Sequence, residues 1–225
     1  MHTQNIKRIL SNTTLYKMLD DRQLDEITGG TQPIRAMANT CVVSQGDAPK
    51  GVYILVYGQV KVGFDRKDGS EKTLAILGQN KCFGLSEMLL DRTHLAFVKT
   101  TADSMLLHTT REKVLSVAKE NFGFAQELMF CVGRQFYTLV RDVESYSLQT
   151  AKQRLCGYLL RQSQYQGNDC IELVASKTLV ASRLSLTPET LSRLLHDLSS
   201  DGLVSVAGRK IKILDFEKLG ALLSN

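Results

Sequence analysis

Three polar side chains in the stretch "LTPETLSRLLHDL" have the types and the spacing to hydrogen-bond an external partner. The Thr-Pro pair near its start is an N-cap followed by a residue suited to the first helical position, so the stretch is predicted to be a helix. Glu189 and Arg193 are four residues apart and share an outward face with Ser192, with leucines behind them. Taken alone, such a strip is typical of a surface salt bridge on an amphipathic helix.

The same three side chains also match the edges of DNA bases. An arginine can form two hydrogen bonds to O6 and N7 of guanine, a glutamate can accept one from the amino group of cytosine, and a serine can bond either kind of edge. Glu189 can in addition orient Arg193. This interpretation requires a helix that enters the major groove, so it depends on the elements around the strip.

The C-terminal third of the chain has the element order that such a helix needs. Thr150 and Gln153 form a capping box that begins a helix over "AKQRLCGYLLRQSQ". A short strand, "CIELV", follows, and Ser176 then caps a second short helix, "KTLVASRL". After the helix described above, Gly202 ends the helical run and two apolar strands flank a turn at Gly208. This order predicts a winged helix-turn-helix.

A second set of residues is predicted to contact DNA phosphates, which sets the register of a protein on DNA rather than the sequence it selects. They lie at the starts of the two helices and on the wing, and they are Ser176, Lys177, Thr190, Arg209 and Lys210. For the wing residues, a solvated hairpin turn is an equal alternative. Dimerisation would place two half-sites about one helical turn apart.

The segment from about residue 35 to residue 108 has short strand-like runs broken by turns. The runs "VYILV", "QVKVGF", "KTLAIL" and "MLLHTT" alternate with segments such as "SQGDAPKG" and "DRKDGS". Regular short strands of this kind predict a small β-barrel or jelly roll, with a short helical region before it. We therefore expect an α+β chain with an N-terminal β-jelly-roll barrel, a long helix and a C-terminal winged helix-turn-helix.

A single long helix is predicted from about residue 122 to residue 147. Apolar residues recur in it at alternating spacings of four and three over three heptads, which is the pattern of a coiled-coil seam. A helix lying on the barrel would explain part of the stripe, but its length favours a two-helix dimer interface. The seam residues are Ala125, Met129, Val132, Phe136, Leu139, Val143 and Tyr146.

The composition is that of a soluble protein. The net charge of +5 permits nucleic-acid binding without requiring it. The five cysteines form no C-x-x-C pair, so neither a disulfide framework nor a zinc ribbon is indicated. With no signal peptide and no apolar run that could span a bilayer, we expect a cytoplasmic protein without a membrane partner. The expected domains are a sensing barrel over 1–120, a dimerisation helix and hinge over 121–149, and a DNA-binding domain over 150–225.

Over nearly its whole length the sequence resembles the CRP/FNR superfamily of bacterial transcription regulators. The string "PETLSRLL" resembles the E-x-x-S-R recognition helix of the FNR and DNR branches, and "VASRLSLTPETLSRLLHDL" is similar to the DNR-like, nitric-oxide-responsive group. The resemblance implies a homodimer that reads a TTGA-type palindrome through Glu189, Ser192 and Arg193 and contacts RNA polymerase. Many relatives have glycine where this chain has Ser185. A left-handed conformation is costly for a non-glycine residue, so a differently shaped turn is expected.

An effector of such a regulator would bind in the barrel. In the cyclic-AMP branch, the barrel cassette resembles F-x-G-E-L followed by an Arg-Ser pair that holds the cyclic phosphate. Here Leu85 stands in place of the ribose-binding glutamate, and His94 and Leu95 replace the Arg-Ser pair. On the long helix, Leu139 and Val140 replace the polar pair that meets adenine. Because a cyclic phosphate needs a fixed cation, the sequence argues against cyclic AMP.

Two cofactors of related branches follow from the resemblance. An iron–sulfur cluster needs about four thiolates, and no cysteine precedes Cys41, which argues against a cluster. The DNR resemblance implies haem, with nitric oxide as the signal and His94 or Cys82 as the iron ligand. A polar loop residue and a small buried hydrophobe are the alternative roles of these two. The expected apolar pocket is lined by Leu85, Leu89, Leu95, Phe97, Leu139 and Val140.

The sequence fits three alternatives to a haem-controlled regulator to different degrees. The same regulator could respond to an unknown effector or to none. A jelly-roll metal enzyme would need two or three histidines and a carboxylate converging in the barrel, which holds only His94 and His108. No G-x-S-x-G nucleophile motif is present either, so an enzyme is not expected. A pure ligand-binding module would leave the winged helix unexplained.

Overall fold

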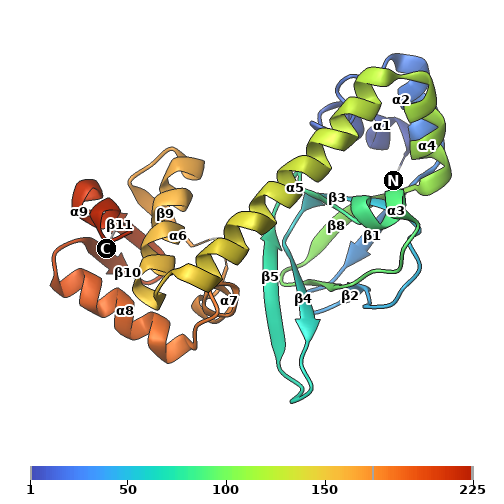
Figure 1. Cartoon of the computed structure of the whole chain (residues 1–225). Coiled ribbons are helices and arrows are strands. Elements are labelled where there is room, and N and C mark those ends of the chain that lie inside the picture. Colours follow the sequence, from blue (N-terminus) through green and yellow to red (C-terminus); the bar gives the residue numbers. More distant parts are fainter. Residues whose placement is uncertain (1, 174, 224–225) are drawn as a thin grey trace. The chain divides into compact units, whose positions relative to one another are not determined.

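The computed structural model describes residues 2–173 and 175–223 and consists of two compact units, Met1–Tyr137 and Thr138–Asn225 (Figure 1). The boundary between the units falls inside the long helix α5 (Phe122–Leu148), which ends one residue beyond its predicted end. The sequence instead places a domain boundary at each end of this helix. Each unit is described by itself below.

The first unit is built on two antiparallel sheets, with strand orders β1-β8-β3-β6 and β2-β7-β4-β5. All four of the strand runs named from the sequence are strands. The strands are β1 (Thr31–Ala36), β2 (Cys41–Val43), β3 (Gly51–Tyr57), β4 (Val60–Asp65), β5 (Glu71–Leu77), β6 (Cys82–Phe83), β7 (Phe97–Thr100) and β8 (Ser104–Thr110). The helices that accompany them are α1 (Thr3–Ser11), α2 (Asp21–Gly29), α3 (Leu85–Leu90) and α4 (Arg111–Glu120).

Strand β3 connects the two apolar clusters of this unit. Val52 and Ile54 lie in a core with residues of α1, α2, α4 and the first turns of α5. Tyr53 and Leu55 lie in a second cluster formed by strands of both sheets. Successive side chains of a strand point to opposite faces, so a strand buried on both faces reads as a continuous apolar run. This is why "GVYIL" shows no polar alternation.

The second unit contains the predicted winged helix-turn-helix. Thr150 and Gln153 form the expected capping box at the start of its first helix. In the three-stranded sheet, of order β10-β11-β9, Val204 pairs with Ile213 across the wing. Gly208 forms the turn with a φ of 63°, a left-handed conformation that favours glycine. The elements are α6 (Ala151–Gln166), β9 (Cys170–Glu172), α7 (Lys177–Arg183), α8 (Pro188–Ser200), β10 (Val204–Ala207), β11 (Lys210–Ile213) and α9 (Phe216–Ala221).

Candidate nucleic-acid interface

Helix α8 begins where the sequence predicts, and its buried and exposed faces are the predicted ones. The hydroxyl oxygen of Thr187 accepts a hydrogen bond from the main-chain N–H of Thr190 at 3.2 Å, and Pro188 occupies the first turn. The buried face consists of leucines spaced three and four residues apart, namely Leu191, Leu195 and Leu198. Because these leucines fix the helix against the unit, the opposite face is exposed, and it carries Glu189, Ser192 and Arg193.

Glu189 and Arg193 do not form the surface salt bridge that their spacing would allow. The Glu189 carboxylate accepts hydrogen bonds from its own main-chain N–H and from the Thr187 hydroxyl, which together lower the pKa of this carboxyl. Among the residues that the structure describes, the Arg193 guanidinium has no hydrogen-bond or ion-pair partner. Its donors are therefore directed to solvent, and the outward strip is available to an external partner.

The turn before α8 keeps its left-handed residue although that residue is serine. Ser185 has a φ of 57°. The N–H of Leu186 donates to the carbonyl of Ala181 at 2.9 Å, and the N–H of Ser185 donates to the carbonyl of Ser182 at 3.2 Å. This pair of bonds is a Schellman motif, which ends a helix around one left-handed residue. The expectation of a differently shaped turn is therefore wrong, because the two bonds hold Ser185 in the conformation that glycine would adopt.

Two arginines connect the helix-turn-helix to the helices before it. The Arg183 guanidinium donates to the Asp142 carboxylate of α5 at 2.6 Å, and both side chains are mostly buried. Arg154 of α6 donates from Nε to the carbonyl of Leu184 at 2.9 Å and from Nη1 to the carbonyl of Gln149 at 2.7 Å. The turn is thus held from two sides, and Arg154 connects it to Gln149, in the segment where the sequence predicts a hinge.

The predicted phosphate-contacting residues of the two helices lie at helix starts. The Ser176 hydroxyl caps α7 by accepting from the N–H of Leu179 at 3.2 Å, and the adjacent Lys177 is half-buried. The Thr190 hydroxyl lies 3.0 Å from the Thr187 hydroxyl. Main-chain N–H groups and positive dipole ends at such positions favour phosphate oxygens.

The two wing residues differ in what they bind. Arg209 donates from Nε and Nη2 to the carbonyl of Leu173, at 3.2 Å and 2.8 Å. It therefore anchors the wing to the residue after β9. Lys210 is exposed on β11, where it pairs in register with Glu172.

The predicted seam on α5 is exposed along most of its length in the single chain. The start of the helix is buried through Phe124 and Leu128, which lie in the core of the first unit. Ala125, Val132 and Tyr146 of the seam are half-buried. The other seam residues are large apolar side chains that are more than half exposed, namely Met129, Phe136, Leu139 and Val143.

Within the first unit, the residues expected to line an effector pocket do not gather in one place. Leu85 is buried among the helices, whereas Phe97 lies on β7 and Leu95 is 72% exposed. Leu89 is 38% exposed. Leu139 and Val140 belong to the second unit and are about half exposed there.

His94 lies inside the protein rather than at a pocket mouth. Its side chain is 4% exposed, and Nδ1 is 3.9 Å from Oε1 of Glu87. Its main chain bonds to Asp47 and Gly46. With His94 enclosed and Leu95 directed to solvent, these residues do not fit a haem site with His94 as ligand. Haem binding stays a prediction from the resemblance alone.

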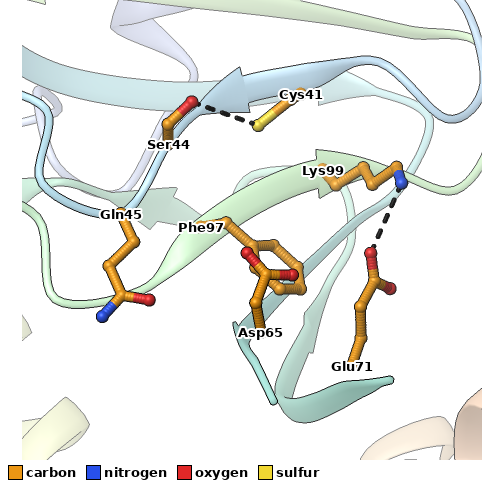
Figure 2. Close-up of a pocket in the computed structure, with 7 residues that line it drawn as sticks. All are labelled: Cys41, Ser44, Gln45, Asp65, Glu71, Phe97 and Lys99. Atoms are coloured by element: carbon orange, nitrogen blue, oxygen red, sulfur yellow. Dashed lines mark hydrogen bonds and ion pairs between the residues drawn. The ribbon is translucent and has the colours of Figure 1, made fainter. Parts of the chain in front are cut away.

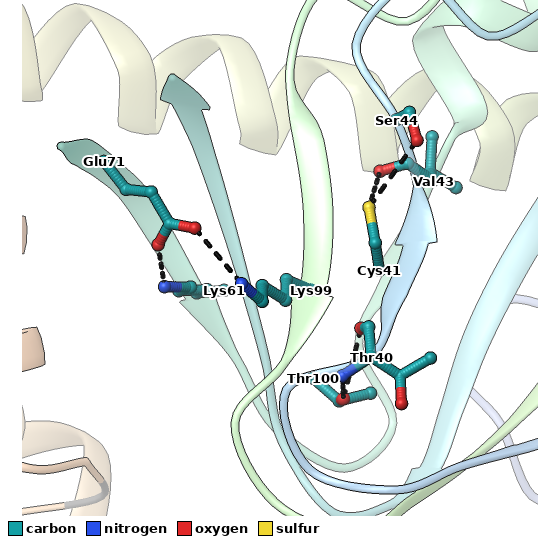
Figure 3. A network of polar contacts seen from close by, with 8 residues as sticks. All are labelled: Thr40, Cys41, Val43, Ser44, Lys61, Glu71, Lys99 and Thr100. Carbon is teal, nitrogen blue, oxygen red and sulfur yellow. Dashed lines mark hydrogen bonds and ion pairs between the residues drawn. The ribbon is translucent and has the colours of Figure 1, made fainter. Parts of the chain in front are cut away.

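A polar cavity that the sequence did not predict lies on the sheet of β2, β7, β4 and β5 (Figure 2). At about 180 Å³ it is smaller than the roughly 300–1,000 Å³ typical of sites for drug-sized ligands. The Glu71 carboxylate forms ion pairs with Lys61 and with Lys99, whose Nζ lies 3.4 Å from Oε1 of Glu71 (Figure 3). Burial raises the pKa of Glu71, but these two lysines outweigh it and hold the pKa below its ordinary value. The lining residues are Cys41, Ser44, Gln45, Asp65, Glu71, Phe97 and Lys99.

Comparison with known proteins finds both expected domains. Residues 33–121 match the cyclic nucleotide-binding domain, and residues 153–222 match the Crp-like helix-turn-helix domain. The cyclic AMP receptor protein of Thermus thermophilus is 26% identical over 169 residues, which cover 75% of this chain and 77% of that protein. FixK2 from Bradyrhizobium japonicum shares the fold with a TM-score of 0.77 at 20% identity, covering 85% of this chain and 96% of that one. DNR from Pseudomonas aeruginosa has a TM-score of 0.52 at 28% identity, covering 99% and 100%.

The chain belongs to the CRP/FNR family of DNA-binding transcription regulators, since it carries both domains in that order. The predicted α+β fold is confirmed. The similar proteins are transcription regulators, so the alternative of a jelly-roll enzyme is excluded. They include a cyclic AMP receptor, a global nitrogen regulator and DNR, and do not assign the chain to one branch.

Within residues 2–173 and 175–223, no helix has the length and apolarity to cross a bilayer.

Proposed function

We propose that two copies of this chain bind a TTGA-type palindrome in double-stranded DNA, with Glu189, Ser192 and Arg193 of each α8 reading base edges. The observation that supports this proposal is the exposed Arg193 guanidinium, which has no partner in the described part of the chain and lies on the face opposite the buried leucines. The N-terminal half of a recognition helix faces the bases, where an arginine fork matches guanine. The lowered pKa keeps Glu189 ionised as an acceptor for cytosine.

Contacts to the phosphates would come from the start of α7 and from the wing. Ser176, Lys177 and Thr190 lie beside helix N-termini, and Lys210 is the exposed lysine at the start of β11. Two of the Arg209 donors are hydrogen-bonded to the carbonyl of Leu173, so the main contribution of Arg209 is to position the wing. These contacts neutralise phosphates and make the affinity fall steeply with salt.

The dimer would form through the α5 seam. Exposed apolar residues at heptad spacing are costly in water and are covered when two such helices pair. A two-fold dimer presents two α8 helices, which is why the target is a palindrome with half-sites about one helical turn apart. Such a dimer is expected to act in the cytoplasm on promoter DNA and to contact RNA polymerase.

Control of this dimer is proposed to come from the barrel, where an effector would change the packing of α5. A ligand can do so only if it prefers one packing over the other. The residues at positions 85, 94 and 95 argue against cyclic AMP as that ligand. The same regulator without a small-molecule effector is the alternative.

A titration of full-length protein against two labelled duplexes tests the proposal. One duplex carries two TTGA half-sites, and the other has the same length and composition with the half-sites scrambled. We expect two chains per duplex, and binding to the palindrome about 10³-fold tighter than to the scrambled duplex. Equal affinity for both duplexes would contradict sequence reading, and one chain per duplex would contradict the dimer.

A further inference from the structure

Cys82 and Cys131 bring two thiols together from distant parts of the sequence. Cys82 begins β6, and Cys131 lies in α5 after Phe124 and Leu128. Both side chains pack, partly buried, against the core of the first unit, and each thiol is the largest influence on the pKa of the other. Both cysteines are free.

An ion pair on α5 between the buried Glu127 and the exposed Arg134 makes these two thiols chemically different. Nη2 of Arg134 donates to Sγ of Cys131 at 3.3 Å and to Oε1 of Glu127 at 2.8 Å. The three residues are four and three apart, so they share one helix face. The hydrogen bond from Cys82 and the Arg134 cation lower the pKa of Cys131 to about 6. The pKa of Cys82 is raised, because its proton is shared with Cys131 and because it is buried.

We propose that Cys131 and Cys82 form a hydroperoxide-reactive dithiol that closes into a reversible disulfide. Cys131 is the nucleophile because the neighbouring guanidinium and the Cys82 thiol stabilise its thiolate, and Cys82 is the resolving thiol because it retains its proton beside it. Cys131 is half-buried, so a small peroxide can reach it, and it differs in this from the fully buried Cys156.

The proposed reaction takes place in two steps. The Cys131 thiolate, whose proton has gone to solvent, attacks the terminal oxygen of a hydroperoxide. The O–O bond breaks, the alkoxide or hydroxide leaves and takes a proton from solvent, and Cys131 becomes a sulfenic acid. The Cys82 sulfur then attacks the Cys131 sulfur, the S–O bond breaks, and hydroxide leaves with the Cys82 proton as water. Two thiols are oxidised to one disulfide and one peroxide is reduced by two electrons.

The disulfide would tie α5 to β6 next to the proposed seam. Cys131 lies between Met129 and Val132 in sequence, but it faces the core with Phe124 and Leu128 rather than the exposed stripe. It would therefore remain outside the helix–helix contact of a dimer. Because the thiol pair lies wholly within the first unit, it does not depend on the DNA-reading role proposed for α8.

The test is disulfide mapping of the full-length protein. Reduced protein is treated with hydrogen peroxide at neutral pH, its remaining thiols are alkylated, and its peptides are identified by mass spectrometry. We expect a Cys82–Cys131 cross-link that a dithiol reductant reverses, with Cys156 and Cys170 still alkylated. Peroxide that leaves both thiols reduced, joins Cys131 to another cysteine, or converts it only to sulfinic acid would overturn the proposal.

Variants separate the reactive pair from a merely structural contact. Cys82→Ser should stop the reaction at the Cys131 sulfenic acid, which a dimedone probe detects, while Cys170→Ser should leave the cross-link unchanged. Arg134→Gln should slow alkylation of Cys131 at neutral pH by roughly tenfold and move its pH profile upward, since the thiolate loses its cation. An unchanged pH profile in a folded Arg134→Gln protein would remove Arg134 from the site. Wild-type mapping decides the pairing even if a variant fails to fold.

Discussion

Tyr146 and Arg183 form two hydrogen bonds with each other, which join the end of α5 to the last turn of α7. The Tyr146 hydroxyl donates to the main-chain carbonyl of Arg183, and the Arg183 guanidinium donates to the same hydroxyl. Asp142, one helical turn before Tyr146, accepts from the other end of that guanidinium. Burial raises the pKa of Tyr146, so the phenol keeps the proton that it donates. The end of the long helix is therefore part of the DNA-binding unit.

Breaking this contact should destabilise the second unit. Arg183→Gln leaves the mostly buried Asp142 carboxylate without its cation, so we expect a loss of about 1–3 kcal/mol in the free energy of unfolding. A double-mutant cycle with Tyr146→Phe in urea unfolding should give a positive coupling energy. Lys152→Gln is the matched control, because its pair with Asp201 is exposed and should contribute little. Equal losses of unfolding free energy in Arg183→Gln and Lys152→Gln would show that the buried contact contributes no more to stability than the exposed one.

Ser185 is held in a left-handed conformation that its side chain disfavours. Ser185→Gly should therefore be more stable than Ser185→Ala by about 1 kcal/mol, since glycine alone adopts this φ without steric cost. Comparing glycine with alanine cancels the loss of the hydroxyl, which both variants share. Thermal and urea unfolding of the two variants measure the difference. A glycine variant that is less stable than the alanine variant would contradict the strained-turn interpretation.

Phe136 lies in the middle of the proposed seam and is 66% exposed in the single chain. Phe136→Glu would place two unpaired carboxylates opposite each other in the contact, so we expect monomers by light scattering. Gln135→Glu adds the same charge at the adjacent exposed position outside the seam, and it should remain dimeric. A dimer in both variants would mean that another surface makes the contact.

The barrel is predicted not to bind cyclic AMP. Leu85 is fully buried and apolar, His94 is enclosed beside Glu87, and Leu95 is directed to solvent, so these three positions offer neither a ribose carboxylate nor a fixed cation. Calorimetric titration with millimolar nucleotide should give no saturating heat. A clear binding isotherm would show that main-chain groups or a neighbouring cation hold the phosphate instead.

Features set by short-range sequence patterns could be predicted. The capping box at Thr150, the cap at Ser176 and the Thr187–Pro188 start of α8 each depend on residues within one helical turn, and all are present. The same holds for the turn at Gly208 and for the exposed strip on α8. Their order along the chain was enough to predict the winged helix.

Features that need contacts between distant residues could not be predicted. Strand β6 has only two residues inside a segment that reads as a turn, and it exists because Ile54 and Cys82 pair across the sheet. The Asp142–Arg183 ion pair and the Cys82–Cys131 thiol pair join segments whose proximity no local pattern encodes. Burial of His94 was missed for the same reason, since its "DRTHL" context reads as an exposed loop.

The most direct test of the account is the sequence discrimination of Arg193→Ala. Binding of the variant and the wild type is measured, at one salt concentration, to the TTGA palindrome and to a duplex with the half-site guanine replaced. We expect the wild type to prefer the palindrome and the variant to lose that preference by roughly 10- to 100-fold, while its affinity for random DNA changes little. Arg66→Ala, which removes the same charge from an exposed turn of the first unit, should keep the preference. Equal losses of Arg193→Ala on specific and random DNA would contradict the base-reading role.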